Sequence, residues 1–337
     1  MGVLTGRLWF LANSVVVPYQ IARQVKSQII RFFWNAKTAL VKYENLGLPR
    51  EKGGWNIPSV VVLADIFALK TTLRVLQLSP DHPARTLACY FLGVQGRLFS
   101  QAQVTGPKAV NPSAFYRHVI GIFKRISSLR LETPLLEVHN TELAQELLLT
   151  SVNDTSKTQF PWVLLTPSWL PGDIQDVVWR FGWSVLPTAD RMYKWHYTKS
   201  EQCVNCKSHE DNKHALLFCQ VAKTFWTLLG KAYACLKIQR FVNRGPCPHN
   251  HVARLLIAVG FFVLWENRGL AVNQGKPRKN QWRLLSRMYT IVIDHLETEL
   301  FFLGEEEFLK KWSCPFIALT HGRVKFQCAP IEGLRRT

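Results

Sequence analysis

The sequence predicts a mainly α-helical protein, and three observations support this fold class. Apolar residues recur at helical spacing through several long segments, which are separated by glycine and proline clusters. The clearest candidate for strand structure is short, from Ile317 to Phe326, where Gly322 can turn a hairpin. Three cysteines and one histidine also stand close together in a polar segment that is too short to bury a core of its own. We therefore expect helices throughout, with one small module that needs another source of stability.

Four helices are predicted in the first half of the chain. Tyr19 to Trp34 carries apolar residues at helical spacing, with basic residues largely off that stripe. Ser59 is a candidate N-cap for an apolar helix that extends to about Leu78. Further on, Phe115 to Ile126 has one apolar helical face, and a shorter helix is expected from Thr141.

The second half predicts an irregular connector followed by helices. Residues 151–172 are rich in proline and polar residues, which is typical of a connector. Asp173 can cap a helix whose apolar face includes Ile174 and Phe181. Three more helices are then expected. They run from Trp226 to about Leu236, from His251 to Val272 and from Gln281 to Leu303.

Composition and charge limit the classes of protein that fit. The chain of 337 residues is long enough for two or three domains, and 47% hydrophobic against 19% charged residues excludes a disordered tail. The net charge of +19 indicates a polyanionic partner, although a basic solvated surface would have the same composition. Eight cysteines in a chain of this length do not form a dense disulfide framework, which indicates a reducing compartment.

No segment is predicted to span a membrane. The most apolar run, Leu255 to Trp265, has only 11 residues between Arg254 and Glu266. A spanning helix needs about 20 residues. We therefore expect this run to be a buried helix, and we expect no membrane partner.

The polar segment that contains the cysteines has the ligand spacing of a zinc site. The four candidate ligands are Cys203, Cys206, His214 and Cys219. Three thiolates and one imidazole suit tetrahedral zinc, and four protein ligands leave no open position, so we expect one structural ion. His209 is an alternative fourth ligand. Ordinary buried thiols are the other interpretation, which the polar neighbours, Glu210 among them, disfavour.

The residues around this segment extend the motif. They are, in order, Val177-Val178-Trp179-Arg180-Phe181-Gly182-Trp183, Leu186-Pro187-Thr188, Asp190-Arg191, Trp195, the four candidate ligands and Trp226. This succession resembles the CCHC zinc-binding region that follows the polymerase in LINE-type (non-LTR) retrotransposon reverse transcriptases. Near the start, two strings resemble the thumb of the same enzymes, and they are Ile30-Arg31-Phe32-Phe33-Trp34-Asn35 and Gly53-Gly54-Trp55-Asn56-Ile57-Pro58. Trp55 departs from the family, which more often has leucine there.

The resemblance implies four regions and a missing catalytic part. The regions are a thumb-like helical region (1–80), a helical linker (81–160), the reverse-transcriptase zinc-binding region (161–235) and a basic C-terminal helical region (236–337). Copying RNA into DNA needs clustered carboxylates that hold two metal ions, and the chain has no adjacent pair of aspartates. We therefore expect the catalytic palm to be missing and the chain to have no enzyme activity.

The expected remaining function is to bind zinc and nucleic acid, either element RNA or an RNA–DNA duplex. Expected phosphate contacts, with plain solvation as the alternative, are Arg23, Lys26, Arg31, Lys37, Arg180, Arg191, Lys194, Lys276, Arg278 and Lys279. Five tryptophans could stack on single-stranded bases, although we expect most of them to pack in the core, and they are Trp162, Trp169, Trp179, Trp183 and Trp195. A zinc-stabilised protein-interaction module derived from a retrotransposon is the alternative function. The resemblance also implies a protein of the nucleus and/or cytoplasm, with the palm-containing part of the same element's polymerase as a candidate partner.

Overall fold

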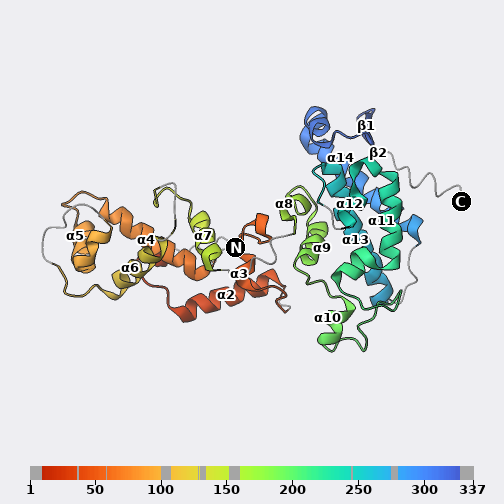
Figure 1. The fold of residues 1–337 in the computed structure, drawn as a ribbon. Helices are drawn as coiled ribbons and strands as arrows, with labels where there is room; N and C mark the ends of the chain where they lie inside the picture. Colours follow the sequence, from red (N-terminus) through yellow and green to blue (C-terminus); the bar gives the residue numbers. More distant parts are fainter. Residues whose placement is uncertain are drawn as a thin grey trace. The chain divides into compact units, whose positions relative to one another are not determined.

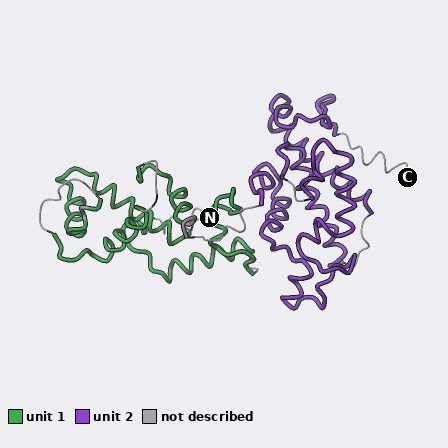
Figure 2. The backbone as a smooth tube through the Cα atoms, viewed as in Figure 1, with its two compact units in different colours: residues 1–156 green, residues 157–337 purple. Residues whose placement is uncertain are grey.

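The computed structural model describes residues 10–35, 38–57, 59–99, 108–127, 129, 134–151, 160–243, 246–274 and 280–326. The chain divides into two compact units, 1–156 and 157–337 (Figure 2), and each is described by itself. The protein is mainly α-helical, as predicted, and the sheet found in the described residues has two strands. The boundary expected at residue 160 lies near the division between the units, whereas those at 80 and 235 fall inside them. The four-region division stays a prediction.

Unit 1 is built from helices (Figure 1). They are α2 (Tyr19–Phe33), α3 (Tyr43–Leu46), η1 (Arg50–Lys52), α4 (Val60–Leu76), α5 (Pro83–Leu92), η2 (Gly93–Leu98), α6 (Ala114–Ile126) and α7 (Asn140–Ser151). The four helices predicted for this half are α2, α4, α6 and α7, and each lies within one or two residues of its expected bounds. Helix α5 was not predicted, because its segment was interpreted as a linker.

Helix α4 is the central helix of unit 1. Its first residue follows Ser59, whose Oγ accepts a hydrogen bond from Val62 N (3.5 Å), as predicted for an N-cap. Helix α4 packs on α6 and α7, and the buried apolar residues of this cluster are Leu63, Ile66, Ala68, Leu69, Val119, Ile122, Ile126, Val138, Leu143 and Ala144. The cluster stabilises the unit because it removes apolar surface of all three helices from water.

Two charged side chains of α4 are also buried. Asp65 is 5% exposed and accepts hydrogen bonds from His118 Nε2 (2.8 Å) and Arg125 Nη2 (2.6 Å) of α6. Lys70 donates to the main-chain carbonyl of Val138, and burial lowers the pKa of Lys70. Both charges therefore have polar partners, as buried charges require.

The Gly53-Gly54 pair turns the chain before α4. Gly53 has a φ of 80°, in the left-handed region that glycine adopts without strain. A Cβ on Gly54 would lie 1.7 Å from the carbonyl oxygen of Leu48, so a larger residue there would displace the backbone. Trp55 N donates to Leu46 O (2.9 Å), which fixes the turn against α3.

Unit 2 contains the remaining elements (Figure 1). They are α8 (Trp162–Leu165), α9 (Gly172–Gly182), α10 (Ala189–Lys194), η4 (His214–Phe218), α11 (Gln220–Ala232), η5 (Ala234–Leu236), α12 (Ile238–Val242), α13 (His251–Gln274), α14 (Gln281–Trp312), β1 (Ile317–Thr320) and β2 (Arg323–Phe326). Helix α8 lies in the segment that was expected to be irregular. Helix α14 continues past the expected end at Leu303, with a kink at Gly304, whose φ is 76°.

The predicted cap of α9 is wrong. The helix begins at Gly172, so Pro171, rather than Asp173, is the residue that precedes it. The first helical hydrogen bond runs from Gln175 N to Pro171 O (2.9 Å), which puts Asp173 inside the first turn. Its Oδ1 accepts a hydrogen bond from Ile174 N (2.9 Å), and its negative charge still suits a helix N-terminus.

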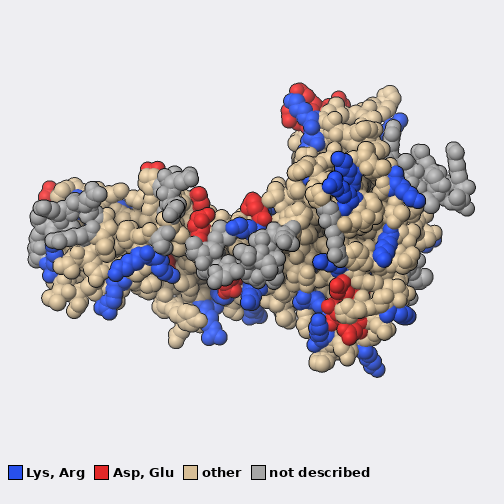
Figure 3. All heavy atoms as spheres, viewed as in Figure 1, with Lys and Arg blue, Asp and Glu red and all other residues tan. Residues whose placement is uncertain are grey.

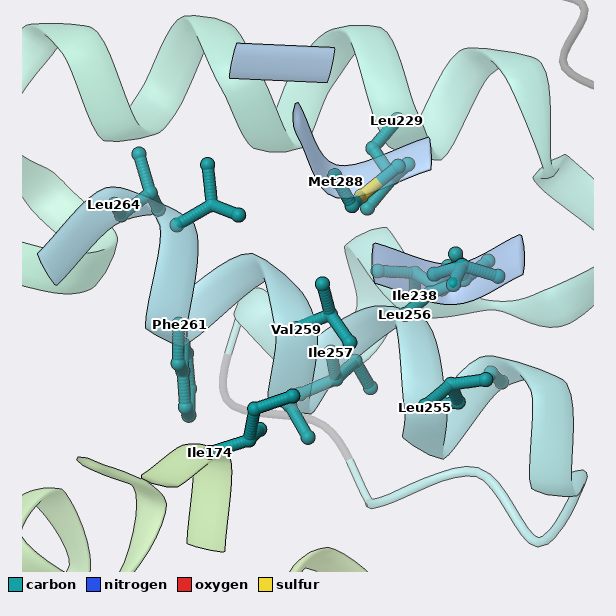
Figure 4. Close-up of a cluster of buried hydrophobic side chains, with 14 of the residues drawn as sticks. Ile174, Leu229, Ile238, Leu255, Leu256, Ile257, Val259, Phe261, Leu264 and Met288 are labelled. Carbon is teal, nitrogen blue, oxygen red and sulfur yellow. The ribbon is translucent and has the colours of Figure 1, made fainter. Parts of the chain in front are cut away.

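Helix α13 forms the centre of the core of unit 2. Its apolar run, Leu255 to Trp265, is mostly buried, as predicted. Figure 4 shows side chains of other helices around it, among them Ile174 of α9, Leu229 of α11 and Met288 of α14. Gly260 permits a close approach of Trp226, because a Cβ at this position would lie 2.5 Å from the indole ring.

By length and composition alone, one described helix could cross a membrane. It is the part of α13 from His251 to Asn273, whose most apolar window has a mean hydropathy of 1.6. That window is 61% buried inside the structure, and α13 packs against α9 and α14. The core helix of a folded unit passes the same test, so these contacts are sufficient to explain the composition of α13.

The predicted hairpin is present as β1 and β2. The strands pair antiparallel, with Thr320 opposite Arg323, and Gly322 in the turn has a φ of 72°. Phe326 is 3% exposed and stacks on Tyr233, with 5.6 Å between the ring centroids. This contact attaches the hairpin to the core of unit 2.

Candidate metal centre

A tight turn in unit 2 presents Cys203 and Cys206. Lys207 N donates to Cys203 O (3.0 Å), and Lys207 has a φ of 60°. An antiparallel bridge between Gln202 and His209 joins the two arms of the turn. Main-chain hydrogen bonds therefore hold this loop, which has few apolar side chains of its own.

The other two donors stand at the ends of a single π-helical turn. This turn, η4, begins at His214, and Cys219 N donates to His214 O (2.7 Å), five residues earlier. Asp211 Oδ1 accepts a hydrogen bond from His214 N (2.6 Å), which fixes the start of the turn. Both donors therefore belong to one helical turn, and this turn is π rather than α. Turns of this kind are frequent at functional sites.

The two segments bring four donor atoms together. One donor atom each from Cys203, Cys206, His214 and Cys219 lies within 4.8 Å of the others. The Sγ atoms of Cys203 and Cys219 are 3.8 Å apart, and Cys206 Sγ is 3.1 Å from His214 Nε2. A disulfide would need about 2.05 Å between sulfurs. Two sulfurs at about 2.3 Å from one tetrahedral zinc ion lie about 3.8 Å apart. The donor set and its spacing therefore fit zinc.

Hydrogen bonds favour the ionised form of one sulfur. The contact with Cys203 lowers the pKa of Cys219 to about 6, and Asn205 Nδ2 donates to the Cys219 sulfur (3.1 Å). The same contact, together with burial, raises the pKa of Cys203 to about 12. Cys219 is therefore the first of this pair to become a thiolate, which is the form that binds a metal.

The structure brings His214, and not His209, to the three cysteines. His209 Nδ1 lies 3.3 Å from Glu201 Oε2, and its side chain is 57% exposed. The group of donor atoms includes His214 instead. The alternative ligand set with His209 does not match this geometry.

Glu210 connects the metal-binding loop to the helical core. The sequence indicated a polar, solvated setting for this residue, but its side chain is only 1% exposed. Glu210 Oε1 accepts hydrogen bonds from Arg268 Nε (2.9 Å), Arg268 Nη2 (2.6 Å) and Ala189 N (2.8 Å). One carboxylate therefore joins the loop to α10 and α13. Sequence reasoning missed this pair, because 58 residues separate its members.

The candidate metal centre is part of the main core of unit 2. Cys203 and Cys219 are 1% and 3% exposed and belong to the same buried cluster as Trp226. Trp226 Nε1 donates to Leu216 O of η4 (2.7 Å). A change in the metal centre should therefore alter the packing of the surrounding helices.

In unit 1, three of the expected phosphate contacts share one groove. Arg23, Lys26 and Arg31 lie on the face of α2 that lines a cavity of about 460 Å³, together with α3 and the start of α4. Lys26 is paired with Glu44 (2.8 Å). Lys37 lies outside the described residues.

In unit 2, the expected phosphate contacts lie on two helices. Arg180 of α9 is paired with Asp176 (2.8 Å), whereas Arg191 and Lys194 lie on α10. Lys276, Arg278 and Lys279 fall outside the described part of the chain. The structure thus describes six of the ten expected basic contacts.

Most of the five tryptophans are in the core, as expected. Trp162, Trp179 and Trp183 are buried, and Trp169 is partly buried against the core. Trp195 is the exception, because it is 39% exposed. Tyr193 and Tyr197 are also exposed beside it, and sequence reasoning missed them because tyrosine carries no signal for burial or exposure by itself.

The family described as zinc-binding in reverse transcriptase matches residues 148–226. Residues 148–226 are therefore similar to the zinc-binding region of reverse transcriptases. The matched region includes all four donors of the metal centre and ends at Trp226. Neither the curated proteins nor the solved structures contain a significant match.

Proposed function

We propose that this protein is the non-catalytic C-terminal part of a LINE-type (non-LTR) retrotransposon reverse transcriptase. It binds one structural zinc ion and nucleic acid, either element RNA or an RNA–DNA duplex. The match to the zinc-binding family, the cluster of four donors and the thumb-like strings near the start of the chain support this proposal. We also infer, from the resemblance alone, a location in the nucleus and/or cytoplasm and a partnership with the palm-containing part of the polymerase.

The zinc ion has a structural role in this proposal. The four ligands are Cys203, Cys206, His214 and Cys219, and together they fill a tetrahedral shell. When bound, zinc supplies a cross-link between the cysteine turn and the π-helical turn. With no open coordination position, the site has no place for a substrate or an activated water.

The groove beside α2 gives the main structural support for nucleic-acid binding. Arg23 and Arg31 are both exposed, and neither has an acidic partner among the described residues. They lie eight residues apart on one helix face, which corresponds to about 12 Å along the axis. Two free guanidinium groups along one groove can contact successive phosphates of a nucleic-acid backbone.

The charge around this groove favours an anion as well. Val60 and Val61 line the same groove and form the start of α4, where the helix dipole places partial positive charge. Figure 3 shows basic side chains on the visible face of each unit, with acidic side chains in smaller groups. The net charge of +19 agrees with a polyanionic partner.

Salt dependence of binding tests the nucleic-acid proposal. We expect the affinity for a structured RNA or an RNA–DNA hybrid to fall by about 10³-fold or more between about 50 and 200 mM salt, because bound phosphates release counterions. Arg23→Ala or Arg31→Ala should reduce the slope of log K against log salt by about 1. Lys310→Ala is the matched control, because it removes one exposed charge from α14 that already pairs with Glu306 and Glu307. An affinity that barely changes with salt would contradict the proposal.

The proposal also states that this chain does not copy RNA. No adjacent pair of aspartates occurs in the sequence, and two-metal nucleotidyl transfer needs clustered carboxylates. Primer extension by the purified, zinc-loaded protein should therefore yield no product above a no-enzyme control. Template-dependent extension that survives purification to homogeneity would show that the proposal is wrong.

A protein-interaction module is the second candidate function. Phe301 and Phe302 of α14 are 83% and 77% exposed, and Leu309 beyond the kink is 44% exposed. Apolar side chains that project into water in a group are typical of a docking surface. Capture of a defined protein partner that survives nuclease treatment and is lost in Phe301→Ser/Phe302→Ser would favour this function over nucleic-acid binding.

A further inference from the structure

Five consecutive residues at the end of α10, Tyr193 to Tyr197, are all exposed. The exposed fractions are 45% for Tyr193, 39% for Trp195 and 75% for Tyr197. Three aromatic side chains within five residues would ordinarily be buried, because aromatic rings contribute much to a core. This turn, which we name the α10 turn, therefore exposes rings that the core of unit 2 does not use.

The main chain holds the α10 turn in one conformation. His196 has a φ of 61°, and His196 N donates to Tyr193 O (2.9 Å). Tyr197 N donates to Met192 O (2.9 Å), so the pair of hydrogen bonds forms a Schellman motif at the end of α10. The rings therefore project from a defined turn rather than from an open loop.

Positive charge lies beside the rings. The guanidinium of Arg191 lies 4.9 Å from the centroid of the Trp195 ring, and Arg191 Nη1 donates to Ser184 O (2.7 Å). The Lys194 side chain is 70% exposed and only loosely paired with Asp190, at 3.9 Å. Cationic groups interleaved with aromatic rings are suited to a ligand that is both anionic and flat.

The α10 turn is fixed to the metal centre at its other end. Ala189 N and Asp190 N, at the start of α10, donate to Oε1 (2.8 Å) and to the main-chain carbonyl (3.2 Å) of Glu210. Glu210 follows the cysteine turn directly in the sequence and is held by Arg268. The rings are thus presented by a rigid part of unit 2.

We propose that the α10 turn is a stacking surface for unpaired bases of single-stranded RNA or DNA. This inference rests on the proposed function and specifies the form of nucleic acid that unit 2 binds. Single-stranded bases have free faces that stack on aromatic rings, whereas a duplex keeps its bases covered. A protein partner fits less well, because the charged Lys194 and the polar His196 interrupt the apolar surface. Phe301, Phe302 and Leu303, by contrast, are three consecutive exposed apolar residues.

Binding of strands with and without bases tests the proposal. Full-length, zinc-loaded protein is titrated with a labelled single-stranded oligonucleotide, with an abasic strand of the same length and with the matching duplex. We expect Tyr197→Ala and Trp195→Ala each to weaken binding of the base-containing strand by about 5- to 150-fold and to leave the abasic strand and the duplex unchanged. Tyr197→Phe, which keeps the ring, and Phe301→Ala, which removes an equally exposed ring elsewhere, should bind as the wild type does.

Three results would overturn the proposal. They are equal wild-type affinity for the base-containing and abasic strands, unchanged affinity in both Tyr197→Ala and Trp195→Ala, and a loss in Tyr197→Phe as large as that in Tyr197→Ala. Zinc content and thermal unfolding of each variant establish that it is folded, and Tyr197 is exposed enough for its replacement to leave folding intact. Salt-dependent binding without any base dependence would contradict the stacking surface alone, whereas no binding of any strand would contradict the proposed function itself.

Discussion

Units 1 and 2 each bury a carboxylate, but the cations that face the two carboxylates differ. Asp65 in unit 1 contacts His118 and Arg125, whose side chains remain 36% and 62% exposed. Glu210 in unit 2 contacts Arg268, whose side chain is only 10% exposed. Water can replace a lost partner in unit 1, but it reaches Arg268 poorly. Unit 2 therefore depends more strongly on Glu210 than unit 1 does on Asp65.

The candidate metal centre adds to this difference. Among the described residues, the group of cysteine and histidine donors lies in unit 2, where two of its cysteines are part of the core. Unit 1 instead has a core of aliphatic side chains from α4, α6 and α7. We therefore expect the two units to respond differently to four changes, and the change with the largest expected effect comes first.

Removal of zinc should give the largest effect, and only in unit 2. Structural zinc contributes about 10–16 kcal/mol in zinc-finger peptides, which is comparable to the whole stability of a domain. Chelation should therefore make residues 157–337 sensitive to limited proteolysis while unit 1 stays resistant. Mass spectrometry of the fragments locates the cuts. Equal loss of protection in both units would contradict the comparison.

Glu210→Ala should give the next largest effect. It leaves the Arg268 guanidinium buried without its partner, which costs about 3–5 kcal/mol. Urea unfolding of unit 2, monitored by hydrogen exchange in α13, measures the loss in free energy of unfolding. A loss below about 1 kcal/mol would mean that Arg268 finds water or another acceptor.

Asp65→Ala in unit 1 is the matched substitution. It should lower the free energy of unfolding by less than Glu210→Ala does. Its partners are already partly exposed, so they can be hydrated after the carboxylate is lost. We expect a loss of about 1–3 kcal/mol, with the unfolding of unit 2 unchanged. A cost equal to that of Glu210→Ala would remove the distinction between the two buried carboxylates.

The smallest expected effect is a pH dependence through His295. Burial lowers the pKa of His295, so the folded protein keeps it neutral while the unfolded chain takes up a proton below about pH 6.5. The unfolded state then binds more protons, and the free energy of unfolding of unit 2 falls as the pH falls below about 6.5. This contribution is fully retained above that pH.

His295→Gln should flatten this part of the pH dependence. The measure is the difference between the variant and the wild type across about pH 5 to 8, because metal binding is itself pH-dependent. Parallel curves for the two proteins would show that His295 does not contribute.

Local sequence signals predicted much of the fold. Helix α4 begins after Ser59 because its hydroxyl accepts the expected hydrogen bond, and Gly322 turns the hairpin as expected. The four metal ligands are also a local pattern, so their grouping followed from spacing. The choice of His214 over His209 depended on the π-helical turn, which spacing alone did not specify.

Long-range contacts explain what the sequence could not predict. Glu210 is polar in a polar segment, and its burial depends on Arg268, which is distant in the chain. Trp195 resembles the other tryptophans in sequence, but the turn after α10 directs it to solvent whereas Trp162, Trp179 and Trp183 reach the core. The helix start at Gly172 moved Asp173 into the first turn, because the extended Pro171 already precedes the helix.

Native mass spectrometry of the purified protein tests the central claim most directly, because it counts the ions held by the four donors. We predict one zinc ion per chain in the wild type and in Cys235→Ser, which replaces an exposed cysteine, and none in Cys219→Ser. A wild-type chain without metal, or a Cys219→Ser chain that keeps its zinc, would contradict a zinc site at these residues.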